Sequence, residues 1–567
     1  MSDVSHSPDG GPGADAAPPM IRVQGALDSA LAPESLATIG VPDIARFLAR
    51  QRWFGGKGRV VTSAVMRDVV PLAWASYRAA AVRLEVGSDN GGVAQYQLLL
   101  GVQAVADAPA TRSQSALARV ESSEEGAGVL IDATRDPHFR SLLGVAFREG
   151  AVFDTHRARW SVEPIAVPGE WIAMDAETRV ISAEQSNTSI VYGDRAILKL
   201  FRRLEPGEQP DVEIGRFLTT RTAFRNTPEL LGVITFAWHG ATSVAGILQR
   251  FIPGAEDAWS YALAAARRAA HGTGGMAGGR GAGEGSEAGS APAGSFAGDA
   301  FRLGRVTRAL HDALASEADE PAFAPERVTR ADIEAWSDGT RRSIDSAFEL
   351  LQARLSAGSL DTQTTAAARA LLGRRAAFDE RVDTLVGGVD DDAGLRIRVH
   401  GDYHLGQLLR TPDSDFLVID FEGEPARALE ARRAKQSPLR DVAGMLRSFA
   451  YAAATAAREA TGRTVNPEVE RATARWERAA REAFLRGYLG ADASAAGAPA
   501  SHSPTGNGAT PVAWSEGAGT LLPRASEHVQ ALLALFETEK VFYELAYELN
   551  NRPEWVWIPM RGVARLL

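Results

Sequence analysis

The chain has 567 residues, a formal net charge of −10 and no cysteine. This length predicts roughly two to four folded units. The acidic balance argues against nucleic acid and anionic membranes as partners, and the lack of cysteine excludes disulfides, thiolate catalysis and cysteine-ligated zinc. Residues 1–20 have no basic start and no apolar core, so they are not expected to be a signal peptide, and we expect a disordered tail. No apolar run approaches the length of a membrane span. The expected location is the cytoplasm.

The segment after this tail predicts a small β-rich unit. Residues 36–52 have apolar side chains at helical spacing and lead into Arg52–Arg59, a turn whose tryptophan and phenylalanine either plug a small core or take part in binding. Two strands are expected at Ala79–Val86 and Val93–Leu100, because Asn90-Gly91 between them supplies the positive φ of a hairpin turn.

A second series of strands contains a lysine in an apolar setting. Lys199 lies in the strand Ala196–Phe201, where its ammonium group is costly unless anionic partners such as nucleotide phosphates neutralise it. An edge strand that points Lys199 to solvent is the alternative. The helix that begins at Pro210 carries Glu213, the expected carboxylate partner. The preceding loop offers hydroxyls and amides in place of glycines for phosphate contact, from Ser186, Asn187 and Thr188.

The next strand pair ends at Pro253-Gly254, where a kinase has the hinge between its lobes. Adenine would meet the backbone just before it, at Gln249, Phe251 and Ile252. Further on, 271–298 and 491–519 are dominated by small residues and are expected to be flexible insertions. Helices are expected at 301–315, 332–354, 364–384 and 527–550.

Two acidic loops follow one another in the second half of the chain. His400–Gln407 contains Asp402, and the apolar run Leu417–Ile419 predicts a strand that delivers Asp420. Phosphoryl transfer needs a carboxylate near the acceptor hydroxyl, a polar metal ligand a few positions on, and a second carboxylate between metal and phosphates. Asp402, Gln407 and Asp420 fit these roles. An isolated H-x-D is weak, but with Lys199 and Glu213 the order is that of a kinase.

The remaining residues of these loops have supporting roles. His400 is expected to brace the loop, and His404 either braces it or approaches the phosphates. Gln407 stands where many kinases have asparagine, and its carbonyl oxygen can still bind a hard cation, so ATP and Mg²⁺ are the expected cofactors. Asp420 begins D-F-E rather than D-F-G, which argues against a protein-kinase activation switch.

These motifs resemble those of bacterial maltokinases over His400–Gln407, Asp420–Pro425, Ser437–Tyr451, Tyr543–Pro559 and Arg52–Arg59. The resemblance implies an α+β, two-lobed protein-kinase-like fold, with a β-rich N-lobe and a helical C-lobe, preceded by a β-rich N-terminal cap and intermediate subdomain. It also implies transfer of the ATP γ-phosphate to the anomeric hydroxyl of maltose. The product, maltose 1-phosphate, feeds α-glucan synthesis, and trehalose synthase is an implied partner.

On this basis the expected division is 1–20 tail, 21–160 cap and intermediate subdomain, 161–254 nucleotide-binding N-lobe, and 255–567 helical C-lobe. Sugars favour carboxylate and amide hydrogen bonds with aromatic platforms. The predicted sugar-site residues are therefore Glu422, Arg440, Tyr543, Glu544, Tyr547, Asn551 and Trp555. The alternative for the tail segment is a packed terminal helix with an aromatic plug.

Two other functions stay open. A kinase of the same fold could act on glucosamine or another small sugar, since the nucleotide motifs do not distinguish acceptors. A pseudokinase that serves as a glucan-binding module is the alternative of another class. A dead kinase is expected to lose at least one of Lys199, Asp402 and Asp420, and all three are present.

Overall fold

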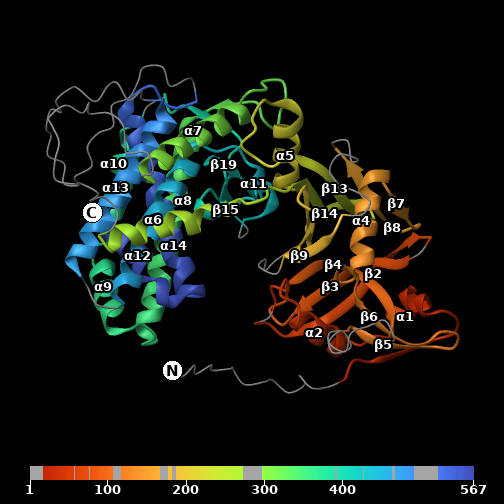
Figure 1. Cartoon of the computed structure of the whole chain (residues 1–567). Coiled ribbons are helices and arrows are strands. Elements are labelled where there is room, and N and C mark those ends of the chain that lie inside the picture. The colour runs from red at the N-terminus through yellow and green to blue at the C-terminus, as the bar shows by residue number, and fades with distance from the viewer. Residues whose placement is uncertain are drawn as a thin grey trace. The chain divides into compact units, whose positions relative to one another are not determined.

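The computed structural model (Figure 1) describes residues 17–56, 58–75, 77–105, 116–165, 176–181, 187–272, 296–389, 392–424, 427–462, 466–490 and 521–566. They belong to two compact units. The first comprises Met1–Arg216 and Pro228–Pro253, and the second comprises Phe217–Thr227 and Gly254–Leu567. Among the described helices, none combines the length and apolar character that crossing a bilayer requires. Of the two expected insertions, 491–519 and most of 271–298 lie outside the described residues, as do residues 1–16 of the tail.

The first unit begins with a mixed sheet. The expected hairpin of β3 (Tyr77–Ser88) and β4 (Val93–Ala104) is confirmed, and Gly91 in its turn has φ 77°. Trp53 and Phe54 are 7% and 5% exposed and pack on Tyr96 of β4, which favours the core-plug interpretation of their turn. The strand order is β1 (Met20–Val23), β5 (Ala118–Ser122), β6 (Gly126–Asp132), β4 (Val93–Ala104), β3 (Tyr77–Ser88) and β2 (Val61–Trp74), with β12 (Arg203–Leu204) also paired to β4.

A second, wholly antiparallel sheet follows in the same unit. Its order is β7 (Val152–Asp154), β8 (Ala158–Pro164), β13 (Leu230–Trp238), β14 (Ala241–Arg250), β11 (Ala196–Phe201), β10 (Asn187–Tyr192) and β9 (Thr178–Ile181). Side chains alternate between the faces of a strand. Leu198 and Leu200 of β11 enter the core that includes α4 (Pro137–Glu149), whereas Phe201 joins a cluster with Val212 of α5 (Pro210–Arg221). The same alternation puts Lys199 on the α5 face.

The second unit is mainly helical. The insertion expected at 271–298 extends too far, since α7 already begins at Phe296. The ring of Phe296 is buried against Phe449 and Trp476, and this packing favours an ordered helix start. The single helix expected at 364–384 is also wrong: Gly373, a poor helix former, ends α9, and α10 begins anew at Arg375. The helices are α6 (Ala258–Ala270), α7 (Phe296–Leu314), α8 (Arg330–Ser356), α9 (Thr362–Leu372), α10 (Arg375–Gly387), α11 (Leu429–Arg433), α12 (Leu439–Thr461), α13 (Pro467–Leu489), α14 (Ser526–Asn551) and α15 (Trp557–Ala564).

Two glycines allow α7 and α13 to pack backbone against backbone. A Cβ atom on Gly304 of α7 would fall on the carbonyl oxygen of Phe484, and one on Gly487 of α13 would fall on that of Phe301. Since backbone atoms cannot move aside as a flexible side chain does, the close crossing depends on both glycines. This crossing fixes α7, which carries His311 of the candidate site.

We expect Gly304→Ala to lower the free energy of unfolding by about 2–3 kcal/mol, because the added methyl group overpacks the crossing. Gly298→Ala in the first turn of the same helix is the matched control, since among the described residues no atom outside the helix's own nearby backbone lies within 4 Å of a Cβ there. That control should be neutral or slightly stabilising. Urea denaturation of both variants followed by circular dichroism checks this, and equal midpoints would contradict the packing argument.

Candidate active site

A buried carboxylate holds the His400–Gln407 loop. Asp441, in the first turn of α12 and 2% exposed, accepts hydrogen bonds from the backbone amides of His400 (2.8 Å) and Gly401 (3.0 Å). The Nε2 atom of His311 lies 3.1 Å from the same carboxylate, and its Nδ1 atom lies 2.9 Å from the Tyr488 hydroxyl. Burial raises the pKa of Asp441, but the hydrogen bond and charge of His311 outweigh burial and hold this pKa below its usual value.

His400 is locked into the loop rather than presented to a ligand. It is 1% exposed, its Nε2 donates to the carbonyl of Ile419 (2.9 Å), and its ring packs on Phe421. The bracing role expected for His400 stays a prediction. His404 is partly exposed: its Nδ1 accepts from the Gly406 amide (3.0 Å), and its Nε2 lies 3.7 Å from the carboxylate of Asp402.

Asp402 also faces a lysine from the C-terminal part of the chain. The Nζ atom of Lys540 on α14 lies 3.5 Å from Asp402 and 3.8 Å from Glu424. Burial raises the pKa of Asp402, but the neighbouring His404 and the charge of Lys540 outweigh burial, so this pKa lies well below its ordinary value. Asp402 is therefore ionised at neutral pH and can accept a proton or a hydrogen bond from a hydroxyl group.

The structure brings Gln407 next to the segment that contains Asp420. Strands β18 (Leu408–Arg410) and β19 (Phe416–Val418) form a hairpin, and the amide of Ile419 donates to the carbonyl of Gln407 at 3.0 Å. Asp420 has φ 66°, an uncommon conformation for a residue with a side chain. Its carboxylate lies within 4.8 Å of that of Glu422. Carboxylate oxygens suit Mg²⁺, so Asp420 and Glu422 fit the expected ion, and the backbone contact of Gln407 brings that residue next to their segment.

A pocket of about 790 Å³, including its open mouth, lies beside Asp402. Its carboxylates face cations from the same walls: Glu424 lies 2.7 Å from Arg427, and Glu539 lies 2.9 Å from Arg440. With Asp402 and Lys540, these pairs balance one another. Among the lining residues are Ser343, Asp402, Glu424, Arg427, Gln436, Arg440, Glu539, Lys540 and Tyr543.

A second hollow adjoins this pocket. It shares Ser343, Gln436, Arg440, Glu539 and Tyr543 with the first and adds other walls. The added walls include Asp332, Trp336, Arg342 and Arg396. The two hollows therefore lie next to one another on shared walls, and together they are called the cleft below.

The predicted sugar-site residues divide between this cleft and other surroundings. Arg440 and Tyr543 line the cleft. Glu544 instead forms an ion pair with Arg447 at 2.7 Å. Tyr547 is 43% exposed and stacks on Tyr543 one turn along α14. The Asn551 amide donates to the carbonyl of Tyr547, Trp555 packs under Arg552, and the carbonyl of Glu422 accepts from Arg432.

The predicted nucleotide residues lie in the first unit. The ammonium of Lys199 is 3.9 Å from the carboxylate of Asp211, which is 1% exposed, and Glu213 is buried on the same helix. Asn187 and Thr188 begin β10, while Ser186 lies outside the described residues. Gln249 of β14 pairs with Ile197 of β11. The chain continues through Phe251 and Ile252, and the backbone amide of Phe251 donates to the carbonyl of Arg195.

Sequence reasoning missed Asp211 and Lys540. An acidic residue directly after a proline is common in the first turn of a helix, where it stabilises the positive end of the helix dipole. Nothing in the sequence therefore marked Asp211 as a partner for Lys199. Lys540 could have been noticed as a cation on the helix face of α14 that also carries Phe536 and Tyr543. The functional assignments of the site residues as a whole stay predictions.

We expect Lys540→Met to raise the pKa of Asp402, because the variant removes a neighbouring positive charge that favours the ionised carboxylate. The measurement is a ¹³C NMR titration of aspartate carboxyls, with the Asp402 signal assigned by its loss in Asp402→Asn. Lys435→Met is the control, since Lys435 pairs with Glu326 instead. An unchanged Asp402 titration in Lys540→Met would show that the pair does not form.

Comparison with known proteins agrees with this architecture. Residues 47–136 match the maltokinase N-terminal cap domain. The chain is 30% identical over 320 residues to a glucosamine kinase of Streptacidiphilus jiangxiensis, covering 55% of this chain and 61% of that protein. It is 27% identical over 402 residues to a glucosamine kinase of Mycolicibacterium smegmatis, covering 70% and 82%.

Among solved structures, a glucosamine kinase in complex with glucosamine, ADP and inorganic phosphate superposes with a TM-score of 0.58 at 20% identity, covering 93% of this chain and 100% of that one. A second crystal form of glucosamine kinase gives the same TM-score at 19% identity, covering 94% and 98%. This likeness concerns the fold. The chain has an α+β, protein-kinase-like fold with a β-rich N-terminal cap region, and the fold class expected from the sequence is confirmed.

Proposed function

We propose that this protein is a sugar kinase that transfers the γ-phosphate of ATP to the anomeric hydroxyl of maltose and releases maltose 1-phosphate and ADP. The observation that carries the proposal is an ionised carboxylate, Asp402, held on a braced loop at the wall of a pocket with paired charges. The cap domain match and the relatives named as kinases support the same class of reaction.

In this mechanism Asp402 orients the anomeric hydroxyl and accepts its proton while the hydroxyl oxygen bonds to the γ-phosphorus and the bond to the β–γ bridging oxygen breaks. Lys199, with Asp211 or Glu213 as its carboxylate partner, would hold the α- and β-phosphates. Gln407, Asp420 and Glu422 would hold Mg²⁺, which neutralises phosphate charge when bound. Most of the acceleration would come from alignment and charge neutralisation, since the transition state is loose.

The walls of the pocket favour an uncharged acceptor. Asp402, Glu424 and Glu539 each already face a lysine or arginine. An ammonium group on the acceptor would therefore have to compete with cations that are held in place, whereas sugar hydroxyls can hydrogen bond to carboxylates and guanidinium groups alike. A second sugar ring of the acceptor would lie in the adjoining hollow, which shares Gln436 and Tyr543 with the pocket.

Glucosamine is the second candidate acceptor. The two relatives described above carry that name, and one solved structure of similar fold contains glucosamine. A role for trehalose synthase as a partner rests on the maltokinase resemblance and the cap domain match. Subcellular location in the cytoplasm is likewise an expectation from the sequence.

We expect Asp402→Asn to bind MgATP with an affinity within about twofold of the parent chain and to lower kcat by about 10³-fold, because the amide cannot accept the acceptor's proton. Asp413→Asn in the exposed turn of the neighbouring hairpin is the control and should keep full activity. Steady-state kinetics with a coupled ADP assay and isothermal titration calorimetry give the two quantities. Near-normal turnover of Asp402→Asn would refute its assignment.

The acceptor is decided by incubating the full chain with ATP, Mg²⁺ and a sugar panel that includes maltose, glucose and glucosamine, followed by ³¹P NMR. We expect an anomeric phosphate on maltose and slower or no reaction with glucosamine, because the pocket's carboxylates are already neutralised. ATP consumption with amino sugars alone, or a phosphate on a non-anomeric carbon, would overturn the maltose assignment and leave the kinase class standing.

A further inference from the structure

The cap region and the strand that carries Lys199 are joined through one buried arginine. Arg202 directly follows β11 and is 1% exposed. Its guanidinium lies 2.8 Å from the carboxylate of Asp132 at the end of cap strand β6 and donates to the hydroxyl of Thr134 at 3.1 Å. It also lies over the ring of Trp53, 5.0 Å from its centroid. The Arg52–Arg59 turn thus supplies one wall of the Arg202 site.

The same arginine reaches the start of β10. Its Nε atom donates to the hydroxyl of Thr188 at 2.9 Å, and Thr188 is paired with Leu200, the neighbour of Lys199 in β11. Arg202 therefore contacts the cap with one side of its guanidinium and Thr188, one of the predicted phosphate-contact residues, with the other.

A glutamine fixes the backbone at this point. The amide of Gln97, on cap strand β4, donates to the carbonyl of Arg202 at 2.7 Å. The Gln97 side chain donates to the carbonyls of Phe201 (3.2 Å) and Ala245 (3.0 Å) and accepts from the indole of Trp160 (3.0 Å). With Gln97 fully buried, these bonds leave the end of β11 little freedom to shift.

We propose that Arg202 is a positioning residue through which the cap region sets the affinity of the chain for a nucleoside triphosphate. Asp132 and Trp53 fix the guanidinium, and the guanidinium fixes Thr188 and the end of the Lys199 strand. The sequence before β10 has no glycine-rich motif to wrap phosphates closely. The hydroxyl of Thr188, at the start of β10, is therefore a predicted phosphate contact, and Arg202 holds it. The proposal rests on the proposed kinase function and assigns the cap a part in it.

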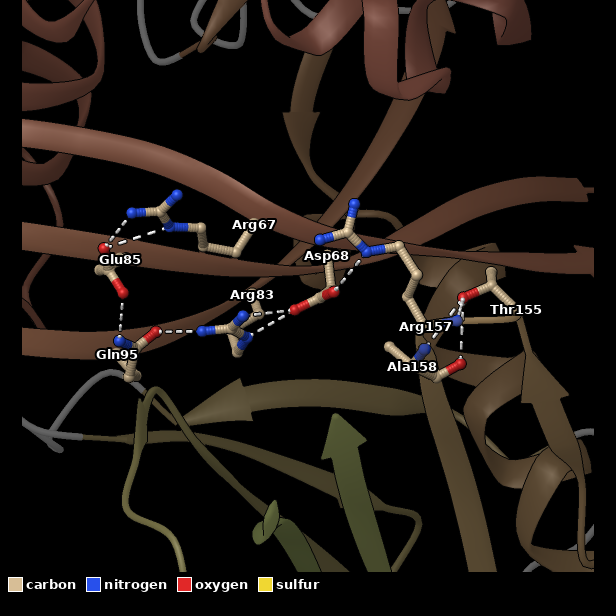
Figure 2. Close-up of polar contacts among 8 residues, drawn as sticks. All are labelled: Arg67, Asp68, Arg83, Glu85, Gln95, Thr155, Arg157 and Ala158. Atoms are coloured by element: carbon tan, nitrogen blue, oxygen red, sulfur yellow. Dashed lines mark hydrogen bonds and ion pairs between the residues drawn. The ribbon is translucent and has the colours of Figure 1, made fainter. Parts of the chain in front are cut away.

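The chain contains a closely matched control for Arg202. Arg83 of β3 is also a buried arginine at the junction of the two sheets: it bonds Asp68 at 2.7 Å, lies over Trp238 at 4.9 Å from its centroid, and bonds Gln95 at 2.8 Å. Figure 2 shows Arg83 between Asp68 and Gln95, with Arg157 on the far side of Asp68. None of these named partners of Arg83 belongs to β10 or β11.

The test compares Arg202→Met with Arg83→Met in the full chain. Each variant removes one buried guanidinium from the same junction, so both should lower the melting temperature. We expect Arg202→Met to weaken MgATP binding by about tenfold, the size expected for one lost charge-assisted hydrogen bond, and to raise KM for ATP with little change in KM for the sugar. Arg83→Met should bind MgATP like the parent chain. Isothermal titration calorimetry and steady-state kinetics give these values.

Equal MgATP affinity of Arg202→Met and the parent chain, or equal weakening in both variants, would overturn the proposal. If Arg202→Met does not fold, Asp132→Asn replaces it, since this change removes the ion pair and keeps the arginine; unchanged MgATP affinity in Asp132→Asn would also overturn the proposal. A parent chain that binds no MgATP would instead refute the kinase function itself.

Discussion

The buried carboxylate of Asp441 is the interaction on which the candidate active site depends. A carboxylate at this depth is tolerated only if hydrogen bonds replace the water it loses. Its partners are two consecutive loop amides and His311, which come from the His400 loop and α7. This arrangement holds Gly401 at φ 82°, a conformation that glycine adopts without strain. The backbone conformation of Gly401 in turn sets the direction of the chain at the next residue, Asp402.

The ion pairs of the two units lie in different surroundings and have different effects. In the second unit, paired charges line an open pocket, where both members of a pair can hydrogen bond to a polar ligand. In the first unit, Arg202 and Arg83 are enclosed between two sheets together with their carboxylates. Such pairs add little net stability compared with a well-packed apolar junction, but removing one partner is costly. They therefore select one arrangement of the two sheets over others.

Residues with unusual local settings could be predicted from the sequence. Lys199 stands out in an apolar strand, and Asp402 and Asp420 stand out because each follows a strand-like run at a fixed distance from the other motifs. Long helices with a clear period, such as α8 and α14, were also predictable. Lys540 was not, because only the packing of α14 brings it to Asp402. The partners of Arg202 lie as much as 149 residues away at Trp53, and no local pattern reports such a contact.

The pairing of β12 with β4 has a consequence for how the chain folds during synthesis. Strand β4 ends at Ala104. Its partner strand β12, which consists of Arg203 and Leu204, is synthesised about a hundred residues later. Until they emerge from the ribosome, part of a long strand has unpaired amides and carbonyls, which invite association with other nascent chains. The cap region cannot finish its own sheet, so a fragment that ends before β12 is expected to be aggregation-prone even though it contains every residue of the cap domain match.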